Sequence, residues 1–170
     1  ASEPLKSMML LFTKNPNGKI NQKGKAFENH VVKMFDGFKS VQNIKTTHKG
    51  ESYELDVLLF LDNTLFVFEC KVQFQHEDVR GYCRNIQELD YYIAKFKRNL
   101  DYFFNEESGR LSIDSRLKRY NSSFDINKVK VIPIFLSNIS YPFTQKNDIY
   151  ILDEVKLYNF FNSQSPHIHF

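Results

Sequence analysis

Apolar residues in the first half of the chain follow two different periods. Between residues 22 and 38 they recur every three or four positions, which predicts an amphipathic helix. Residues 41–47 read as a strand, and two nearly continuous apolar runs follow at 57–61 and 65–68. The Asp62-Asn63 pair between these runs suits the tight turn of a β-hairpin. The first half therefore predicts one helix followed by three strands.

The second half predicts a long helix, two further strands and a closing helix. Apolar positions step by three and four from about residue 78 to residue 104, and residues 129–136 and 149–152 form short β-rich runs. Pro133 removes one hydrogen-bond donor of a sheet ladder, which indicates an edge or an irregular position. Asp153 suits the N-cap of the last helix. This order of elements predicts an α/β domain with a central mixed β-sheet flanked by helices.

Length and composition fit a single domain. The 170 residues, of which 42% are hydrophobic, can build one substantial core. We place the domain at residues 22–162, between an N-terminal arm at 1–21 and a C-terminal tail at 163–170. No apolar run approaches the roughly 20 residues needed to cross a bilayer, so we expect a cytoplasmic protein without a membrane segment. The domain could still be a module of a larger protein, and its oligomeric state is open.

Charged residues interrupt the predicted hairpin where a buried core is expected. Asp56, Glu69 and Lys71 lie within its two strands. If the two residues of the turn form the whole loop, Asp56 lies directly opposite Glu69 and Glu54 lies opposite Lys71. All four side chains then share one face, because strand side chains alternate with period two.

Two carboxylates opposed across a ladder destabilise the strand pair, so they need a neutralising partner. One carboxyl could keep its proton through a raised pKa, Lys71 could form a buried salt bridge, or a hard divalent cation could lie between the oxygens. The cation explains most of the pattern, because it also gives the nearby lysine a role beside a developing negative charge. A charged strand end in a salt bridge is the plainer alternative.

These residues resemble the motif of a known enzyme family. Asp56, a gap of twelve residues and then Glu69-Cys70-Lys71 are similar to the pattern of the PD-(D/E)xK nuclease superfamily, and within it to the restriction-endonuclease-like group with NERD-type and Mrr-type domains. The segment from Gly24 through Phe27-Glu28 to Val31 resembles the glutamate-bearing helix that precedes the motif in that family. The resemblance covers about residues 24–161. Leu55 stands where many members have proline.

The resemblance implies a restriction-endonuclease-like fold and an endonuclease that depends on Mg²⁺ or Mn²⁺. Asp56, Glu69, the backbone carbonyl of Cys70 and Glu28 would hold the metal, while Lys71 would assist the attacking water or the phosphate. DNA is the expected partner and substrate. Two alternatives stay open: an inactive nuclease-like domain that binds nucleic acid or protein, and a toxin or defence nuclease that cleaves RNA.

Three polar residues near the motif are candidate contacts to nucleic acid. Gln87 and Tyr91 match the Gln-x-x-x-Tyr spacing that RecB-type relatives carry on the helix after this motif. The alternative is a helix surface with a half-buried tyrosine. Gln73 extends the face of Glu69 and Lys71 by one step, so it is either a substrate contact or a polar strand end.

A basic stretch supplies the other candidate contacts. The net charge of +3 permits binding to nucleic acid without requiring it. Between residues 109 and 130 six basic residues stand against two acidic ones, and Arg116, Lys118 and Arg119 lie at its centre. We expect this stretch to contact phosphates. An ordinary solvated surface is the alternative.

Overall fold

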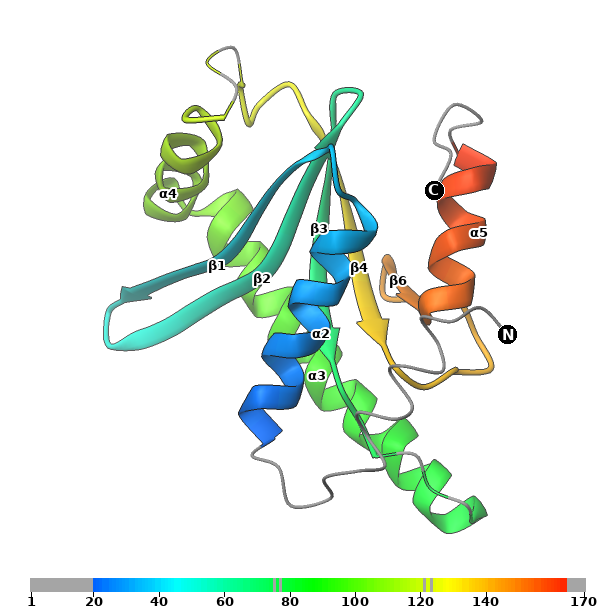
Figure 1. Cartoon of the computed structure of the whole chain (residues 1–170). Helices are drawn as coiled ribbons and strands as arrows, with labels where there is room; N and C mark the ends of the chain where they lie inside the picture. The colour runs from blue at the N-terminus through cyan, green and yellow to red at the C-terminus, as the bar shows by residue number, and fades with distance from the viewer. Residues whose placement is uncertain (1–19, 75, 77, 121, 123, 165–170) are drawn as a thin grey trace.

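The computed structural model describes residues 20–164 apart from 75, 77, 121 and 123 (Figure 1). Its elements in chain order are α2 (Ile20–Met34), β1 (Lys39–His48), β2 (Glu51–Leu61), β3 (Thr64–Lys71), α3 (Val79–Asn105), α4 (Glu107–Leu117), β4 (Lys130–Ser137), β5 (Gln145–Lys146), β6 (Ile149–Leu152) and α5 (Glu154–Gln164). The first helix begins slightly earlier than predicted. Residues 1–19 of the predicted arm and 165–170 of the predicted tail lie outside the described residues.

The strands form one mixed sheet in the order β1-β2-β3-β4-β6-β5. β1, β2 and β3 are antiparallel neighbours, whereas β3, β4 and β6 run parallel and β5 returns antiparallel to β6. Helices cover both faces of this sheet, with α2 on one side and α3 on the other (Figure 1). The predicted fold class, α/β with a central mixed sheet flanked by helices, is confirmed.

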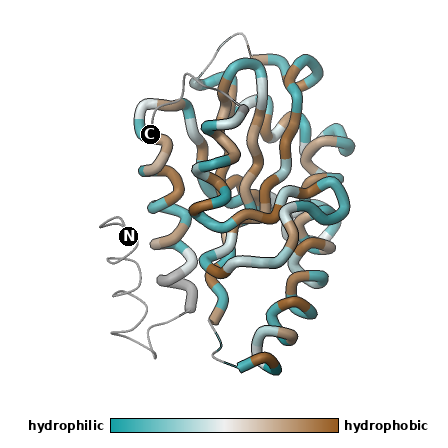
Figure 2. Tube along the Cα trace, turned by 90° about the vertical axis from the view of Figure 1, so that its right-hand side faces the viewer, coloured by the Kyte–Doolittle hydropathy of each residue, from teal (hydrophilic) through white to brown (hydrophobic). Residues whose placement is uncertain are grey.

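Two apolar clusters hold the layers together. Phe27 and Val31 of α2 and Phe161 of α5 pack with Phe68 on one face of the sheet. On the opposite face, α3 and α4 pack against the sheet through a second cluster of buried side chains: Leu58, Val67, Leu89, Ile93, Phe96, Phe103, Ile113, Leu117 and Phe135. Brown apolar residues accordingly follow the central strands in Figure 2, while the turns are mostly teal. In the described residues no helix is long and apolar enough to cross a membrane.

The central hairpin has the turn and register expected from its sequence. Asp62 and Asn63 have φ angles of 45° and 62°, as a two-residue type I′ turn requires. The β2–β3 ladder pairs Leu61 with Thr64 and continues in step to Val57 and Phe68. The predicted pairing is therefore confirmed from the turn as far as Val57.

One helix was missed, and Pro133 lies at an irregular position of an internal strand, the second of the two alternatives expected for it. α4 was not predicted, because its packing depends on a close crossing with α3: a Cβ atom at Gly109 would overlap the backbone carbonyl of Tyr102. Pro133 lies in β4, which is an internal strand and not an edge. Its missing N–H is tolerated because β6 pairs only with Ile134 to Leu136, so Pro133 has a ladder partner on the β3 side alone.

Candidate active site

The sheet departs from regular pairing at Asp56. The β2–β3 ladder ends at Val57, and the β1–β2 ladder passes from Val57 to Leu55 without pairing Asp56 with Asn43, whose φ is 53°. In place of the ladder bond, Oδ2 of Asp56 accepts a 2.7 Å hydrogen bond from the backbone N–H of Cys70. The side chain of Asp56 thus joins β2 to the end of β3, where the motif lies.

Glu69 and Lys71 form a direct ion pair on β3. The Nζ atom of Lys71 lies 2.8 Å from Oε1 of Glu69, and the lysine is the more exposed partner. The predicted shared face of these two residues is confirmed. Glu54, however, was predicted opposite Lys71 and instead pairs with Lys45 of β1, with a 2.6 Å ion pair.

Asp56 and Glu69 are both buried, which makes their charged forms unfavourable. Only 5% of Asp56 and 3% of Glu69 is exposed to solvent. Burial, followed by the charge of Glu69, raises the pKa of Asp56 to about 8, although the hydrogen bond from Cys70 opposes the shift. Burial disfavours the charged form of Lys71, but the charge and hydrogen bond of Glu69 outweigh it and raise the Lys71 pKa. Lys71 is therefore charged at neutral pH and neutralises only one of two adjacent acids.

Glu28 approaches this cluster from α2. It is half-buried, and burial together with the charge of Glu54 raises its pKa, while Lys45 and Lys71 act in the opposite direction. Among the residues that the structure describes, no three His, Cys, Asp or Glu side chains are placed to share one metal ion. Glu28 therefore does not join Asp56 and Glu69 as a direct third ligand in this conformation.

The donor set fits a hard divalent cation. Lys71 is paired with Glu69, while burial and then the charge of Glu69 raise the pKa of Asp56 so that it keeps a proton at neutral pH. A divalent cation would neutralise the acid that the lysine does not. Mg²⁺ is commonly held by one or two carboxylates plus water and substrate phosphate, so a third acidic ligand is not required. The predicted ligands Asp56 and Glu69, and the carbonyl of Cys70 between Glu69 and Lys71, satisfy this chemistry. The assignment of Mg²⁺ or Mn²⁺ stays a prediction.

An aromatic residue of α3 also belongs to this cluster and was missed from the sequence. The Nζ atom of Lys71 lies 5.7 Å from the ring centroid of Tyr92, within cation–π range. The ring of Tyr92 stacks on Phe135, the β4 partner of Glu69. The predicted Gln87 and Tyr91 instead lie on the exposed side of α3, and 68% of Tyr91 is exposed. The alternative expectation, a helix surface on which Tyr91 is half-buried, is therefore wrong as well.

Gln73 is buried within the protein. Its Oε1 atom accepts hydrogen bonds from the hydroxyls of Tyr141 and Ser137, and its backbone N–H and carbonyl both bond to the side-chain amide of Asn138. Its Nε2 atom is buried without a partner among the described residues. These bonds tie the chain just after β3 to the loop after β4. The substrate-contact reading of Gln73 is thus corrected to a structural one.

The basic stretch lies at the other end of the sheet. The backbone N–H of Lys130 bonds to the carbonyl of Asn63 in the hairpin turn, and β4 pairs Lys130 with Thr64 but Ser137 with Lys71. Seven residues of strand correspond to about 23 Å. Arg116, Lys118 and Arg119 precede this point in the chain. Their expected contact with phosphates stays a prediction, and a strand of nucleic acid would have to span about 23 Å to run from Lys130 to Lys71.

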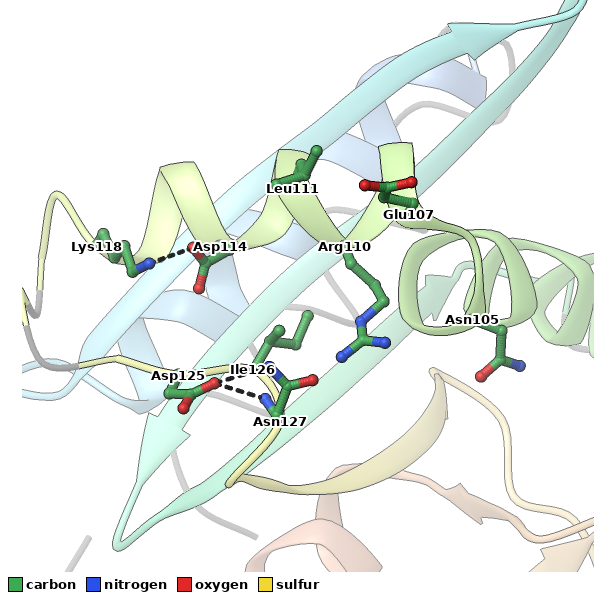
Figure 3. Close-up of a pocket in the computed structure, with 9 residues that line it drawn as sticks. All are labelled: Asn105, Glu107, Arg110, Leu111, Asp114, Lys118, Asp125, Ile126 and Asn127. Carbon is green, nitrogen blue, oxygen red and sulfur yellow. Dashed lines mark hydrogen bonds and ion pairs between the residues drawn. The ribbon is translucent and has the colours of Figure 1, made fainter.

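Part of the basic charge in this stretch is already paired. A cavity of about 330 Å³ lies between α4 and residues 125–127 (Figure 3). Lys118 is bound to Asp114 at 2.6 Å, and Lys128 to Asp125 at 3.2 Å. Arg110 points into the cavity, whose other lining residues include three acids. This end of the molecule is therefore less cationic than the sequence count indicates.

Comparisons with known proteins add one distant structural likeness. No protein-family model matches the chain, and no curated protein matches its sequence. Among solved structures, the chain is similar to the small subunit of the heterodimeric restriction endonuclease R.BspD6I, with 13% identity and a TM-score of 0.37. That match covers 97% of this chain and 78% of the subunit.

Proposed function

We propose that this protein is a nuclease that hydrolyses phosphodiester bonds with the aid of Mg²⁺ or Mn²⁺, and that DNA is its substrate. The observation that carries the proposal is the buried pair of Asp56 and Glu69 beside the ammonium group of Lys71. A divalent cation held there would supply Lewis-acid charge to the phosphate oxygens. Buried acids without a ligand would only weaken the fold, so their placement favours a functional role.

The protein's own groups have distinct roles in this proposal. Asp56, fixed by the N–H of Cys70, and Glu69 hold the cation together with the carbonyl of Cys70. Lys71, oriented by Glu69 and by the ring of Tyr92, presents a positive charge to a non-bridging phosphate oxygen as negative charge develops. Glu28 is not a direct ligand in this proposal. Its raised pKa suits it to transfer a proton through a water molecule.

The same constellation favours an enzyme over a domain that binds without cutting. An inactive descendant has no catalytic need of two buried acids and a paired lysine, so a decayed site would be expected to have lost one of them. Glu28, Asp56, Glu69 and Lys71 are all retained, which supports catalysis. Cleavage of RNA is the remaining alternative, because none of these groups distinguishes ribose from deoxyribose.

The direct experiment is a cleavage assay with four substrates: linear, circular and single-stranded DNA, and RNA. Each is incubated with Mg²⁺, with Mn²⁺ and with EDTA. We expect cleavage of DNA, including circular DNA, with either metal and none with EDTA. Cleavage of RNA alone would change the substrate class, and an absence of cleavage of all four substrates would overturn the proposed activity.

A further inference from the structure

A phenylalanine near the cluster is held in an exposed position. Phe74 follows Lys71 by three residues and is 74% exposed. Its backbone carbonyl accepts a 3.0 Å hydrogen bond from the side-chain amide of Asn85, a buried residue of α3. Phe74 is therefore attached to α3 through its backbone while its side chain projects into solvent.

His76 and Asp78 also contact α3. The ring of His76 packs against α3 so closely that a Cβ atom at Gly81 would overlap it, and it lies 5.5 Å from the ring of Phe74. Asp78 caps α3 by accepting a 2.6 Å hydrogen bond from the N–H of Gly81. Contacts of the Phe74 backbone and of His76 with α3 thus set the place from which the exposed ring of Phe74 projects.

Two arginines lie in the first turns of α3, between the acids Asp78 and Glu88. Arg80 and Arg84 are exposed and lie one helical turn apart, on the turns to which Phe74 and His76 are attached. Neither arginine forms an ion pair with another residue that the structure describes, in contrast to Lys118 and Lys128 of the basic stretch. An exposed ring and two exposed guanidinium groups on the turns of α3 to which Phe74 and His76 are attached match the two chemistries of a nucleic-acid strand, a base face and a phosphate.

We infer that Phe74, Arg80 and Arg84 form a strand-binding surface that stacks on an unpaired base next to the phosphate held at Lys71. This inference rests on the proposed function and narrows its substrate to nucleic acid with unpaired bases near the cleavage point. Three residues of extended chain span at most about 11 Å, so the ring lies within reach of a nucleotide neighbouring the reacting one. A base inside a duplex is stacked between its neighbours and cannot stack on an aromatic side chain, whereas a base in a single strand or a frayed end can.

The test measures binding in EDTA, where cleavage is absent. The probes are a fluorescein-labelled single-stranded oligodeoxynucleotide and its blunt duplex. Phe74→Ala is compared with Tyr158→Ala, which removes another exposed aromatic side chain, on α5. Arg80→Ala/Arg84→Ala is compared with Lys33→Ala/Lys39→Ala, which removes the same charge from exposed sites elsewhere.

We expect wild type to bind the single strand more tightly than the duplex. Phe74→Ala weakens single-strand binding roughly 5- to 150-fold, the effect of losing one base–aromatic stack, and Tyr158→Ala does not. Arg80→Ala/Arg84→Ala reduces the slope of log affinity against log salt concentration by roughly 0.7 for each phosphate contact that is lost on single strands. A second readout is the alkylation of Cys83, an exposed cysteine of α3, which the bound oligonucleotide should slow. Cys70 is buried, so it does not interfere with this measurement.

Several results would overturn the inference. One is equal binding by Phe74→Ala and Tyr158→Ala, with no protection of Cys83; if wild type still cleaves DNA with Mg²⁺, the proposed function stands and only the strand-binding surface fails. Another is self-association in sedimentation that Phe74→Ala abolishes without a change in oligonucleotide affinity, which would assign the ring to a protein contact. If wild type binds and cleaves no nucleic acid, both the inference and the proposed function fail.

Discussion

The carboxylate of Asp56 accepts a 2.7 Å hydrogen bond from the backbone N–H of Cys70, so one acid of the cluster is fixed by the residue between the other acid and the lysine. This bond stands where the β2–β3 ladder stops. Interrupting the ladder costs one backbone pair, but it turns the Asp56 carboxylate toward the end of β3. The geometry of the cluster therefore depends on a local break in an otherwise regular sheet.

The raised pKa of Asp56 predicts how stability changes with pH. Without divalent metal, the folded protein keeps a proton on Asp56 up to about pH 8, while the unfolded chain loses it near pH 4. Stability should then fall as pH rises between these values, with a slope approaching the limit of about 1.4 kcal/mol per pH unit for one proton. Asp56→Asn should flatten this slope. Urea unfolding in EDTA at pH 5 to pH 9 measures it, and identical slopes in wild type and variant would contradict the assignment.

Divalent metal should reverse the cost of the buried acids. Millimolar Mn²⁺ should raise the melting temperature of wild type at pH 7.5, since an ion that binds only the folded state stabilises it. At an ion concentration of one hundred times the Kd, the gain in unfolding free energy is about 2.7 kcal/mol. Asp56→Asn should lose most of this gain. Glu106→Gln, which removes an exposed acid at the start of α4, is the control and should keep it. A wild-type melting temperature that does not respond to Mn²⁺ or Mg²⁺ would argue against a metal site.

The network around Gln73 predicts a stability effect without a binding effect. Burial raises the pKa of Tyr141 to about 12, so its hydroxyl stays a donor to Gln73. Tyr141→Phe should cost about 1 kcal/mol of unfolding free energy, the typical net contribution of one hydrogen bond. Oligonucleotide affinity of the folded variant should not change. A fall in affinity at unchanged stability would return Gln73 and its neighbours to the role of a substrate contact.

The sequence was sufficient for the features that depend on local rules. The turn of Asp62 and Asn63 fixes the hairpin register, and the continuous apolar runs on either side of it specify strands that are buried on both faces. Asp153 likewise caps α5 as expected, with its Oδ1 accepting a 2.8 Å bond from the N–H of Lys156. Each of these signals lies within a few residues of the structure it specifies.

Features that depend on how distant segments meet could not be predicted. Tyr92 and Tyr91 are neighbours in the chain, and only the packing of α3 on Phe135 decides that Tyr92 approaches Lys71. The basic stretch was chosen as a candidate phosphate contact from its charge alone, without knowledge of its position in the fold. Its place at the opposite end of the sheet follows from the bond between Lys130 and Asn63, which are far apart in sequence.

The central claim is that Lys71, held by Glu69, acts on the reacting phosphate, and Lys71→Ala tests it most directly. Cleavage of DNA with Mn²⁺ and binding of the same DNA in EDTA are measured for this variant, for wild type and for Lys146→Ala, which breaks the surface ion pair with Asp90. We predict that Lys71→Ala lowers the cleavage rate by about 100-fold or more, the usual effect of removing one preorganised charge, with only a modest loss of affinity. Lys146→Ala should cleave like wild type. Cleavage by Lys71→Ala at the wild-type rate would contradict the account.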